Sequence, residues 1–201
     1  MEMLKKEQLI IFVKNPIKGK VKTRLGATIG NAKAVEVYRK LLAYTHKVTH
    51  ALQLTKKVYY GDFVNPDDLW DTEGYEKHLQ AEGDLGQRMA SAFQDCFRSG
   101  AEKVVIIGSD LPELTTTILE EAFDALEQQE VVIGPATDGG YYLLGMRQYD
   151  PILFEDIVWS TDTVFSTTIQ KLEKTQRSYT LLPVCSDLDR EEDLRRFPEF
   201  Q

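Results

Sequence analysis

Five cationic side chains are concentrated in the short segment from Lys14 to Arg24, which also contains Pro16 and Gly19. The composition predicts a loop that leads into a helix. Guanidinium groups chelate two phosphate oxygens, ammonium groups act as point charges, and a helix start adds a weak positive field. In a chain of net charge −8, Lys14, Lys22 and Arg24 are therefore candidates to bind a di- or triphosphate. A solvated basic loop is an equal alternative, and the segment lacks the P-loop and three-glycine dinucleotide signatures.

Asp110 follows the apolar stretch 104–107, which is expected to be a strand. A carboxylate at a strand end is costly to bury unpaired, and a Mg²⁺ or Mn²⁺ held between protein and phosphates would lie at such a position. Asp110 is therefore predicted to bind metal. The alternative is that Asp110 caps the following helix, a role for which Thr115 is better placed.

A second acidic group follows the apolar stretch 131–133, where Asp138 precedes Gly139 and Gly140. Adjacent glycines let a ligand approach the backbone closely. Asp138 can accept hydrogen bonds from sugar hydroxyls or an amine, or act as a base toward a hydroxyl acceptor. A tight turn between two buried strands explains the same residues equally well.

A third acidic group, Asp187, Asp189 and Asp193, lies where the chain leaves its last apolar stretch and a helix is expected to begin. Acidic side chains in a first helical turn interact favourably with the helix dipole. The dipole accounts for some of these carboxylates but not for all of them.

The cysteines and histidines indicate no competing chemistry. Cys96 falls on the apolar face of a predicted helix, Cys185 follows a predicted strand, and neither has a partner at metal-ligand spacing. His46 and His50 have a helical spacing that can hold a metal, but no third ligand is nearby. A solvated or core-edge pair of histidines is favoured.

The elements that must position these groups form an α/β pattern. Helical periodicity appears in residues 34–48 and 118–126, between apolar stretches that are mostly continuous rather than alternating, as in a parallel sheet covered on both faces. In such a sheet ligands lie beyond the carboxyl ends of the strands. We expect a single domain over residues 1–201, with a less regular segment at 149–162 that is either a lid or an ordinary connection. The strands are expected at residues 9–13, 58–60, 104–107, 131–133, 141–144 and 179–184.

Composition excludes several classes of protein. A sequence pI near 5.0 disfavours nucleic acid as a partner, and no apolar stretch approaches the roughly 20 residues of a membrane span. Residues 1–7 are too charged for a signal peptide, so a cytoplasmic protein is expected. Trp70, Trp159 and Phe165 suit either a core or an interface, which leaves the oligomeric state open.

Five segments in this order resemble the nucleotide-diphospho-sugar transferase (GT-A) fold, and within it a bacterial family of small glycosyltransferase-like proteins. More distantly, the chain is similar to the guanylyltransferases of molybdenum cofactor and of 2-phospholactate, and to sugar-activating cytidylyltransferases. The resemblance implies a three-layer α/β/α sandwich with a mostly parallel sheet. It rests on Phe12-Val-Lys-Asn-Pro with Lys22-Thr-Arg-Leu, Gly83-Asp-Leu-Gly-Gln-Arg-Met, Gly108-Ser-Asp-Leu-Pro, Pro135-Ala-Thr-Asp-Gly-Gly-Tyr-Tyr-Leu-Leu-Gly and Asp187-Leu-Asp.

The resemblance also implies residue roles. Two aspartates hold the divalent metal in such enzymes, which matches Asp110 and Asp189, although the late motif here departs from the usual Asp-Thr-Pro-Glu-Asp-Leu and leaves Asp187 as an alternative. Lys22 and Arg24 match the phosphate-binding loop. Candidate residues for contact with the nucleotide, further along the chain, are Asp84, Arg88, Gly139 and Gly140; Asp84 as an N-cap and Arg88 as a surface charge are the alternatives.

The implied activity is a metal-dependent transfer from an activated nucleotide. Glycosyl transfer from a nucleotide-sugar to a small acceptor is the first hypothesis. Nucleotidyl transfer from a nucleoside triphosphate to a phosphorylated small molecule is the second, and a non-catalytic nucleotide-binding module is the third. The base, the sugar and the acceptor are not determined by the sequence.

Overall fold

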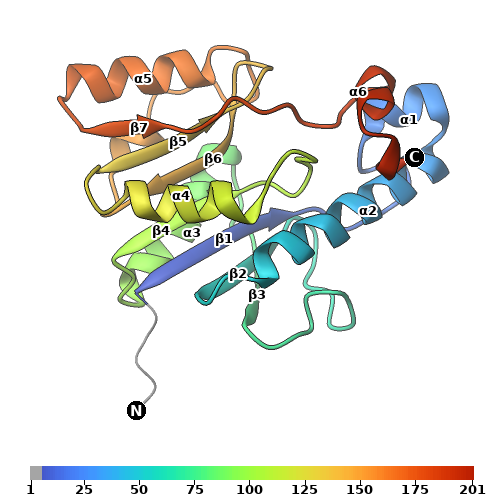
Figure 1. Cartoon of the computed structure of the whole chain (residues 1–201), viewed down its shortest axis with the longest axis horizontal. Coiled ribbons are helices and arrows are strands. Elements are labelled where there is room, and N and C mark those ends of the chain that lie inside the picture. Colours follow the sequence, from blue (N-terminus) through green and yellow to red (C-terminus); the bar gives the residue numbers. More distant parts are fainter. Residues whose placement is uncertain (1–5) are drawn as a thin grey trace.

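The computed structural model describes residues 6–201, so residues 1–5 of the segment weighed as a signal peptide lie outside it. Seven strands form one sheet, drawn in Figure 1. Their order across the sheet is β3-β2-β1-β4-β6-β5-β7, and every neighbouring pair is parallel except the two that involve β6. The strands are β1 (Glu7–Val13), β2 (Thr55–Tyr60), β3 (Tyr75–Leu79), β4 (Lys103–Ile107), β5 (Val131–Pro135), β6 (Tyr141–Met146) and β7 (Tyr179–Leu181).

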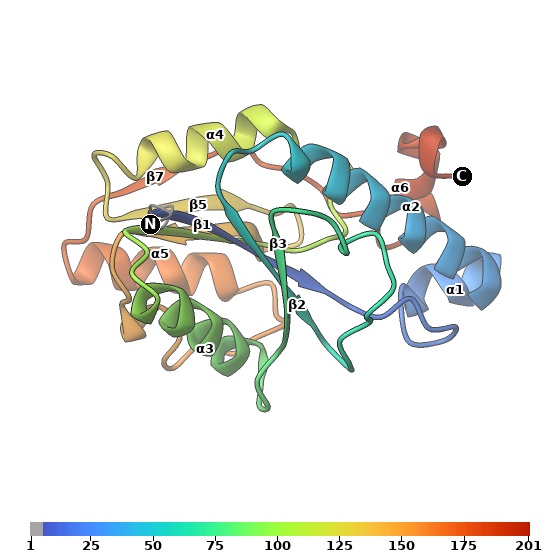
Figure 2. The ribbon, with the colours of Figure 1, turned by 90° about the horizontal axis from the view of Figure 1, so that it is seen from below.

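Helices cover both faces of this sheet. Figure 2 shows α2 and α4 above it and α3 and α5 below it. The expectation of a three-layer α/β/α sandwich with a mostly parallel sheet is confirmed. The helices are α1 (Thr23–Ile29), α2 (Asn31–His50), α3 (Leu85–Arg98), α4 (Thr116–Ala125), α5 (Val164–Lys174) and α6 (Glu191–Arg196), with short 3₁₀ turns at Pro151–Leu153 and Pro198–Phe200.

Two apolar clusters, one on each face of the sheet, form the core. Alternate residues of a strand point to opposite faces, so Leu9 and Ile11 pack with α2 and α4 while Ile10 packs with α3 and α5. Because both faces are covered, the central strands are continuous apolar sequences, as the sequence predicted. Cys96 is buried in the second cluster, which confirms its packing role.

Two strand expectations are wrong. β3 was missed because it is an edge strand that carries Glu76, Lys77 and His78 and pairs only with β2. The last strand ends at Leu181 rather than residue 184, since Pro183 has no N–H to donate to a ladder. Within residues 6–201, no helix combines the length and apolar character needed to cross a bilayer.

His46 and His50 are stacked on each other, with ring centroids 5.3 Å apart, and His46 also stacks on Tyr75. In the described part of the chain, no group of three or more His, Cys, Asp or Glu side chains could hold a metal ion. The ring contacts make the two histidines part of an aromatic cluster at the C-terminal end of α2. Trp70 belongs to the same cluster and is buried.

Candidate active site

A cavity of about 580 Å³ opens beyond the carboxyl ends of β1, β4 and β5, a volume typical of small-ligand sites. The strand ends contribute Phe12, Gly108 and Asp110, and the segments after them contribute charged groups. The charged side chains that line it are Lys14, Arg24, Asp110, Asp138, Asp162, Asp187 and Asp189. The structure thus gathers the three acidic groups and the basic segment of the sequence around one space.

Lys22 occupies the N-cap of α1 in the left-handed backbone region, with φ 46° and ψ 46°. A non-glycine residue adopts this conformation only when its surroundings hold it there, and such strain is concentrated at functional sites. The Lys22 side chain is only 4% exposed; its Nζ donates to Asp110 Oδ2 at 3.0 Å and lies 4.0 Å from Asp189 Oδ1. The strained residue is therefore a lysine whose ammonium group lies close to two carboxylates.

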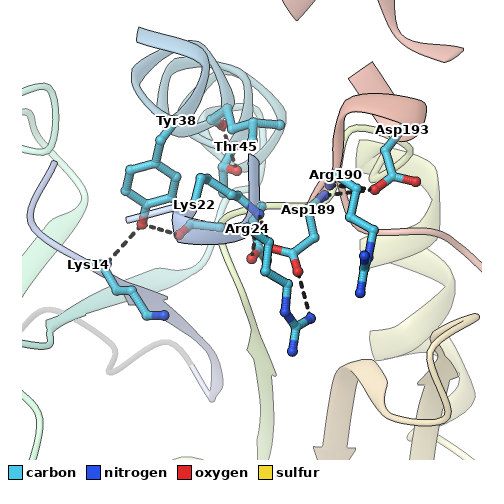
Figure 3. Close-up of polar contacts among 11 residues, drawn as sticks. Lys14, Lys22, Arg24, Tyr38, Thr45, Asp189, Arg190 and Asp193 are labelled. Atoms are coloured by element: carbon cyan, nitrogen blue, oxygen red, sulfur yellow. Dashed lines mark hydrogen bonds and ion pairs between the residues drawn. The ribbon is translucent and has the colours of Figure 1, made fainter. Parts of the chain in front are cut away.

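Asp189 lies between two cations. Its Oδ2 accepts a hydrogen bond from Arg24 Nη1 at 2.8 Å, and Figure 3 shows Arg24 reaching it from α1. The backbone N–H groups of Asp189 and Arg190 donate to the Asp193 carboxylate at 3.0 and 2.8 Å. Asp193 therefore has a structural role at the start of α6, while Asp189 belongs to the charged network of the cavity.

Asp110 and Asp187 differ in their tendency to ionise. The Asp110 carboxyl is open to the cavity but lies deep in the protein, which opposes its charged form. The ammonium of Lys22 outweighs this effect and lowers the pKa of the carboxyl. Burial, reinforced by the negative charges of Asp110 and Asp138, raises the pKa of Asp187 to about 7. The three carboxylates therefore form an electronegative cluster in which Lys22 neutralises Asp110 most directly.

Backbone hydrogen bonds hold Asp187 in this cluster. Ala136 forms an isolated parallel bridge with Cys185, and Thr137 N–H donates to the Cys185 carbonyl at 3.0 Å. Leu188 N–H then donates to the carbonyl of Asp110 at 3.2 Å. The segment between β7 and α6 thus runs past the ends of β5 and β4, which places Asp187 beside Asp110.

Asp138 lies in the turn between β5 and β6, where its Oδ1 accepts a hydrogen bond from Gly140 N–H at 2.9 Å. Gly139 has φ +88°, and a Cβ there would meet the Asp162 backbone oxygen at 2.2 Å. The turn explanation given for this motif is therefore correct. It coexists with a place at the cavity, which Asp138 and Gly140 both line.

Apolar side chains form another part of the cavity wall. Leu85 and Met89 come from α3, Tyr141 begins β6, and Trp159 comes from the irregular segment before α5. The rings of Tyr141 and Trp159 meet edge to face with centroids 6.4 Å apart. Trp159, for which the sequence left core and interface open, is thus a cavity residue.

Gly86 determines where the Trp159 indole lies, since a Cβ at Gly86 would come within 2.1 Å of Trp159 Nε1. Alanine normally favours a helix over glycine by about 1 kcal/mol. We nevertheless expect Gly86→Ala to destabilise the protein by about 1–3 kcal/mol, because the indole must leave its site. Urea unfolding and tryptophan fluorescence test this, with Ser91→Ala in the same helix as the control; unchanged fluorescence in Gly86→Ala would contradict it.

Asp84 and Arg88 have local partners. Asp84 caps α3: its Oδ1 accepts from Gln87 N–H at 2.9 Å, and Gln87 Oε1 accepts from Asp84 N–H at 2.9 Å. Arg88 Nε donates to the Gly83 carbonyl at 2.9 Å. Neither residue lines the cavity, nor does Gly139. Contact between any of the three and a ligand stays a prediction.

Replacing the Asp84 cap gives a clean test. Asp84→Ala should lower the free energy of unfolding by about 1 kcal/mol, since an N-terminal N–H of α3 loses its acceptor. Urea denaturation measures this loss, and thermal stabilisation by nucleotide measures separately whether Asp84 also contacts the ligand. If nucleotide stabilisation disappeared together with the cap, Asp84 would be a ligand residue.

Comparisons with known proteins show which family and which solved structures the chain resembles. The profile of a family described as "Uncharacterized protein conserved in bacteria (DUF2064)" matches residues 28–161. A crystal structure from Desulfovibrio desulfuricans G20, of a protein provisionally called a nucleotide-diphospho-sugar transferase, is 32% identical with a TM-score of 0.88, covering 96% of this chain and 86% of that one. No curated protein sequence matches the chain.

More distant structures share the fold. The inositol-1-phosphate CTP transferase of T. maritima is 14% identical with a TM-score of 0.60, covering 100% of this chain and 96% of that one. Rv0371C from Mycobacterium tuberculosis H37Rv, in complex with manganese, is 13% identical with a TM-score of 0.52, covering 96% and 97%. At these identities the likeness confirms the architecture expected from the sequence.

Proposed function

The chain belongs to the DUF2064 family of proteins conserved in bacteria, and we propose that it is a metal-dependent transferase using an activated nucleotide. In its cavity, a basic loop lies beside a cluster of carboxylates. Glycosyl transfer from a nucleotide-sugar to a small acceptor is its proposed reaction. The proposal rests on one observation: Lys22, a candidate to bind phosphate, lies between Asp110 and Asp189, the two candidates to bind the metal. The likeness to the Desulfovibrio protein supports the same class of enzyme.

The described residues offer no group of three ligands, but two carboxylates of the cluster suit Mg²⁺ or Mn²⁺, which prefers oxygen ligands and is often held by one or two carboxylates together with substrate phosphates. Asp110 and Asp187 are the ligands we favour. Burial, reinforced by repulsion from Asp110 and Asp138, raises the pKa of Asp187, and a bound cation would stabilise its charged form. That Asp189 binds the metal stays a prediction, because its carboxylate already forms an ion pair with Arg24. When bound, the cation would neutralise charge on the departing nucleoside diphosphate.

The chain's own residues supply the other functions. Lys14 and Arg24 line the cavity and would bind the diphosphate, with Lys22 as the buried cation between them and the carboxylates. Asp138 has one oxygen engaged by Gly140 N–H. Its other oxygen would accept the proton of an attacking hydroxyl. A phosphate acceptor would need no such base.

Thermal stability with a panel of nucleotides tests the proposal. A ligand at 100 times its Kd adds about 2.7 kcal/mol, which corresponds to roughly 5–10 °C in a chain of this size. We expect stabilisation by a nucleoside diphosphate or nucleotide-sugar that depends on Mn²⁺ and is lost in Arg24→Ala. Selective stabilisation by a triphosphate would favour nucleotidyl transfer, binding without turnover would favour a non-catalytic module, and no shift with any nucleotide would exclude the donor site.

A further inference from the structure

The cations that line the cavity come from one part of the chain. Among the residues that line it in the described part of the chain, the cations are Lys14, just after β1, and Arg24, in the first turn of α1. A separate part of the lining is formed by residues of the β5–β6 turn, the start of β6 and the segment before α5. It presents carboxylates, hydroxyls and aromatic rings, and we call it the ring subsite: Asp138, Tyr141, Trp159, Ser160, Thr161 and Asp162.

We propose that the ring subsite binds the acceptor, and that this acceptor is a neutral, hydroxylated ring such as a sugar rather than a phosphorylated molecule. The inference rests on the proposed function for its assignment as acceptor site, since the donor phosphates would occupy the basic part of the cavity. The chemistry of the ligand is inferred from the residues of the ring subsite alone.

The charges of the ring subsite disfavour a phosphorylated acceptor. The carboxylates of Asp138 and Asp162 are both exposed, and the contact of Gly139 with the Asp162 backbone holds their two segments together. Carboxylates accept hydrogen bonds from ligand hydroxyls. They repel a phosphate, and no cation of the ring subsite offsets that repulsion. A phosphorylated acceptor would therefore be disfavoured at this part of the lining.

The aromatic residues of the ring subsite favour a ligand that contains a hydroxylated ring. Trp159 and Tyr141 offer an apolar ring face and edge beside these polar groups, an arrangement that suits a ligand with an apolar C–H face and peripheral hydroxyls. The Tyr141 hydroxyl is buried and has no hydrogen-bond partner among the described residues. An unpaired buried hydroxyl is uncommon in a folded protein, and a ligand hydroxyl beside it would satisfy it.

Tryptophan fluorescence gives a direct test, because the chain has two tryptophans and Trp70 is buried in the core. In a Trp70→Phe protein, Trp159 is the single reporter. We would titrate it, without nucleotide or metal, with the methyl and phenyl glycosides of glucose, galactose, mannose and N-acetylglucosamine. Glucose 6-phosphate, cytidine and guanosine are the comparison ligands. If Trp70→Phe does not fold, calorimetry on the unaltered protein replaces fluorescence.

The expected result is saturable binding of at least one neutral glycoside, at least about tenfold tighter than glucose 6-phosphate. Tighter binding of glucose 6-phosphate would overturn the proposal. So would saturation by the nucleosides alone, since the ring subsite would then hold the donor base. The absence of saturation by any glycoside up to about 100 mM, well above a millimolar Kd, would overturn it as well.

Variants separate this inference from the proposed function. Asp138→Asn/Asp162→Asn should reduce the discrimination against glucose 6-phosphate, Trp159→Ala should weaken glycoside binding about tenfold or more, and Trp159→Phe should restore part of it. Val158→Ala, an exposed neighbour outside the cavity lining, is the matched control. Glycoside binding without nucleotide stabilisation would refute the donor site alone, and nucleotide stabilisation without glycoside binding would refute the ring subsite alone.

Discussion

Asp110→Asn is expected to abolish the metal-dependent part of nucleotide binding and to lower turnover about a hundredfold to a thousandfold. The lowered pKa of Asp110 keeps its carboxylate charged at neutral pH, and asparagine removes that charge with little change in shape. The Mn²⁺-dependent shift in melting temperature measures binding. Release of nucleoside diphosphate from a nucleotide-sugar measures turnover. Full metal-dependent stabilisation in the variant would contradict the assignment of Asp110.

A loss of folding must be distinguished from a loss of chemistry in this variant. Asp110→Asn leaves the buried Lys22 ammonium without its nearest partner, but Asp110 is 46% exposed, so the full cost of breaking a buried pair does not apply. We expect a destabilisation of about 1–3 kcal/mol. Lys22→Met/Asp110→Asn removes both charges and should recover most of it. A double variant that is stable and inactive would identify the loss as chemical.

The same measurements separate Asp187 from Asp189. If Asp110 and Asp187 hold the cation, Asp187→Asn should lose the Mn²⁺ dependence. Asp189→Asn should retain it, while nucleotide binding weakens because Arg24 loses its 2.8 Å partner. The reverse pattern would make Asp189 the ligand, as the resemblance to related enzymes implies.

The fold was predictable where the sheet is covered on both faces. β4 and β5 each contain a continuous stretch of Val and Ile because helices pack on either side of them, so burial leaves a pattern in the sequence. β3 leaves none: it lies at the sheet edge, is largely polar, and forms through backbone pairing with β2. Its existence depends on a neighbour rather than on its own composition.

The site was predictable at the strand ends but not in its pairings. Asp110 and Asp138 could be selected because ligands bind where parallel strands end. The hydrogen bonds of Lys22 to Asp110 and of Arg24 to Asp189 span 88 and 165 residues of sequence, so no local pattern encodes them. The same holds for Trp159, whose position depends on the absence of a side chain at Gly86.

Lys22→Met is expected to strengthen the binding of Mn²⁺ to the nucleotide-free protein about tenfold to a hundredfold. In the structure, the Lys22 ammonium donates to Asp110 at 3.0 Å, so a divalent cation that binds this carboxylate must displace it. A hydrogen bond between charged groups contributes about 1.5–3 kcal/mol, which sets the size of the effect. Methionine keeps the length and burial of the side chain without its charge. Calorimetric titration with Mn²⁺ measures the change.

Nucleotide binding should change in the opposite direction, because the phosphates lose one of their cations. Lys20→Met is the matched control: Lys20 belongs to the same basic segment, is exposed, and pairs with Asp62 away from the cavity lining. It should leave both affinities unchanged. If Lys22→Met weakened Mn²⁺ binding instead, Lys22 would be supporting the carboxylate cluster. If only the nucleotide affinity fell, Lys22 would bind phosphate without competing for the metal. The predicted pair of opposite changes would mean that in the free protein the lysine occupies the place of the cation, so that nucleotide binding, by drawing Lys22 toward the phosphates, makes Asp110 available to the metal.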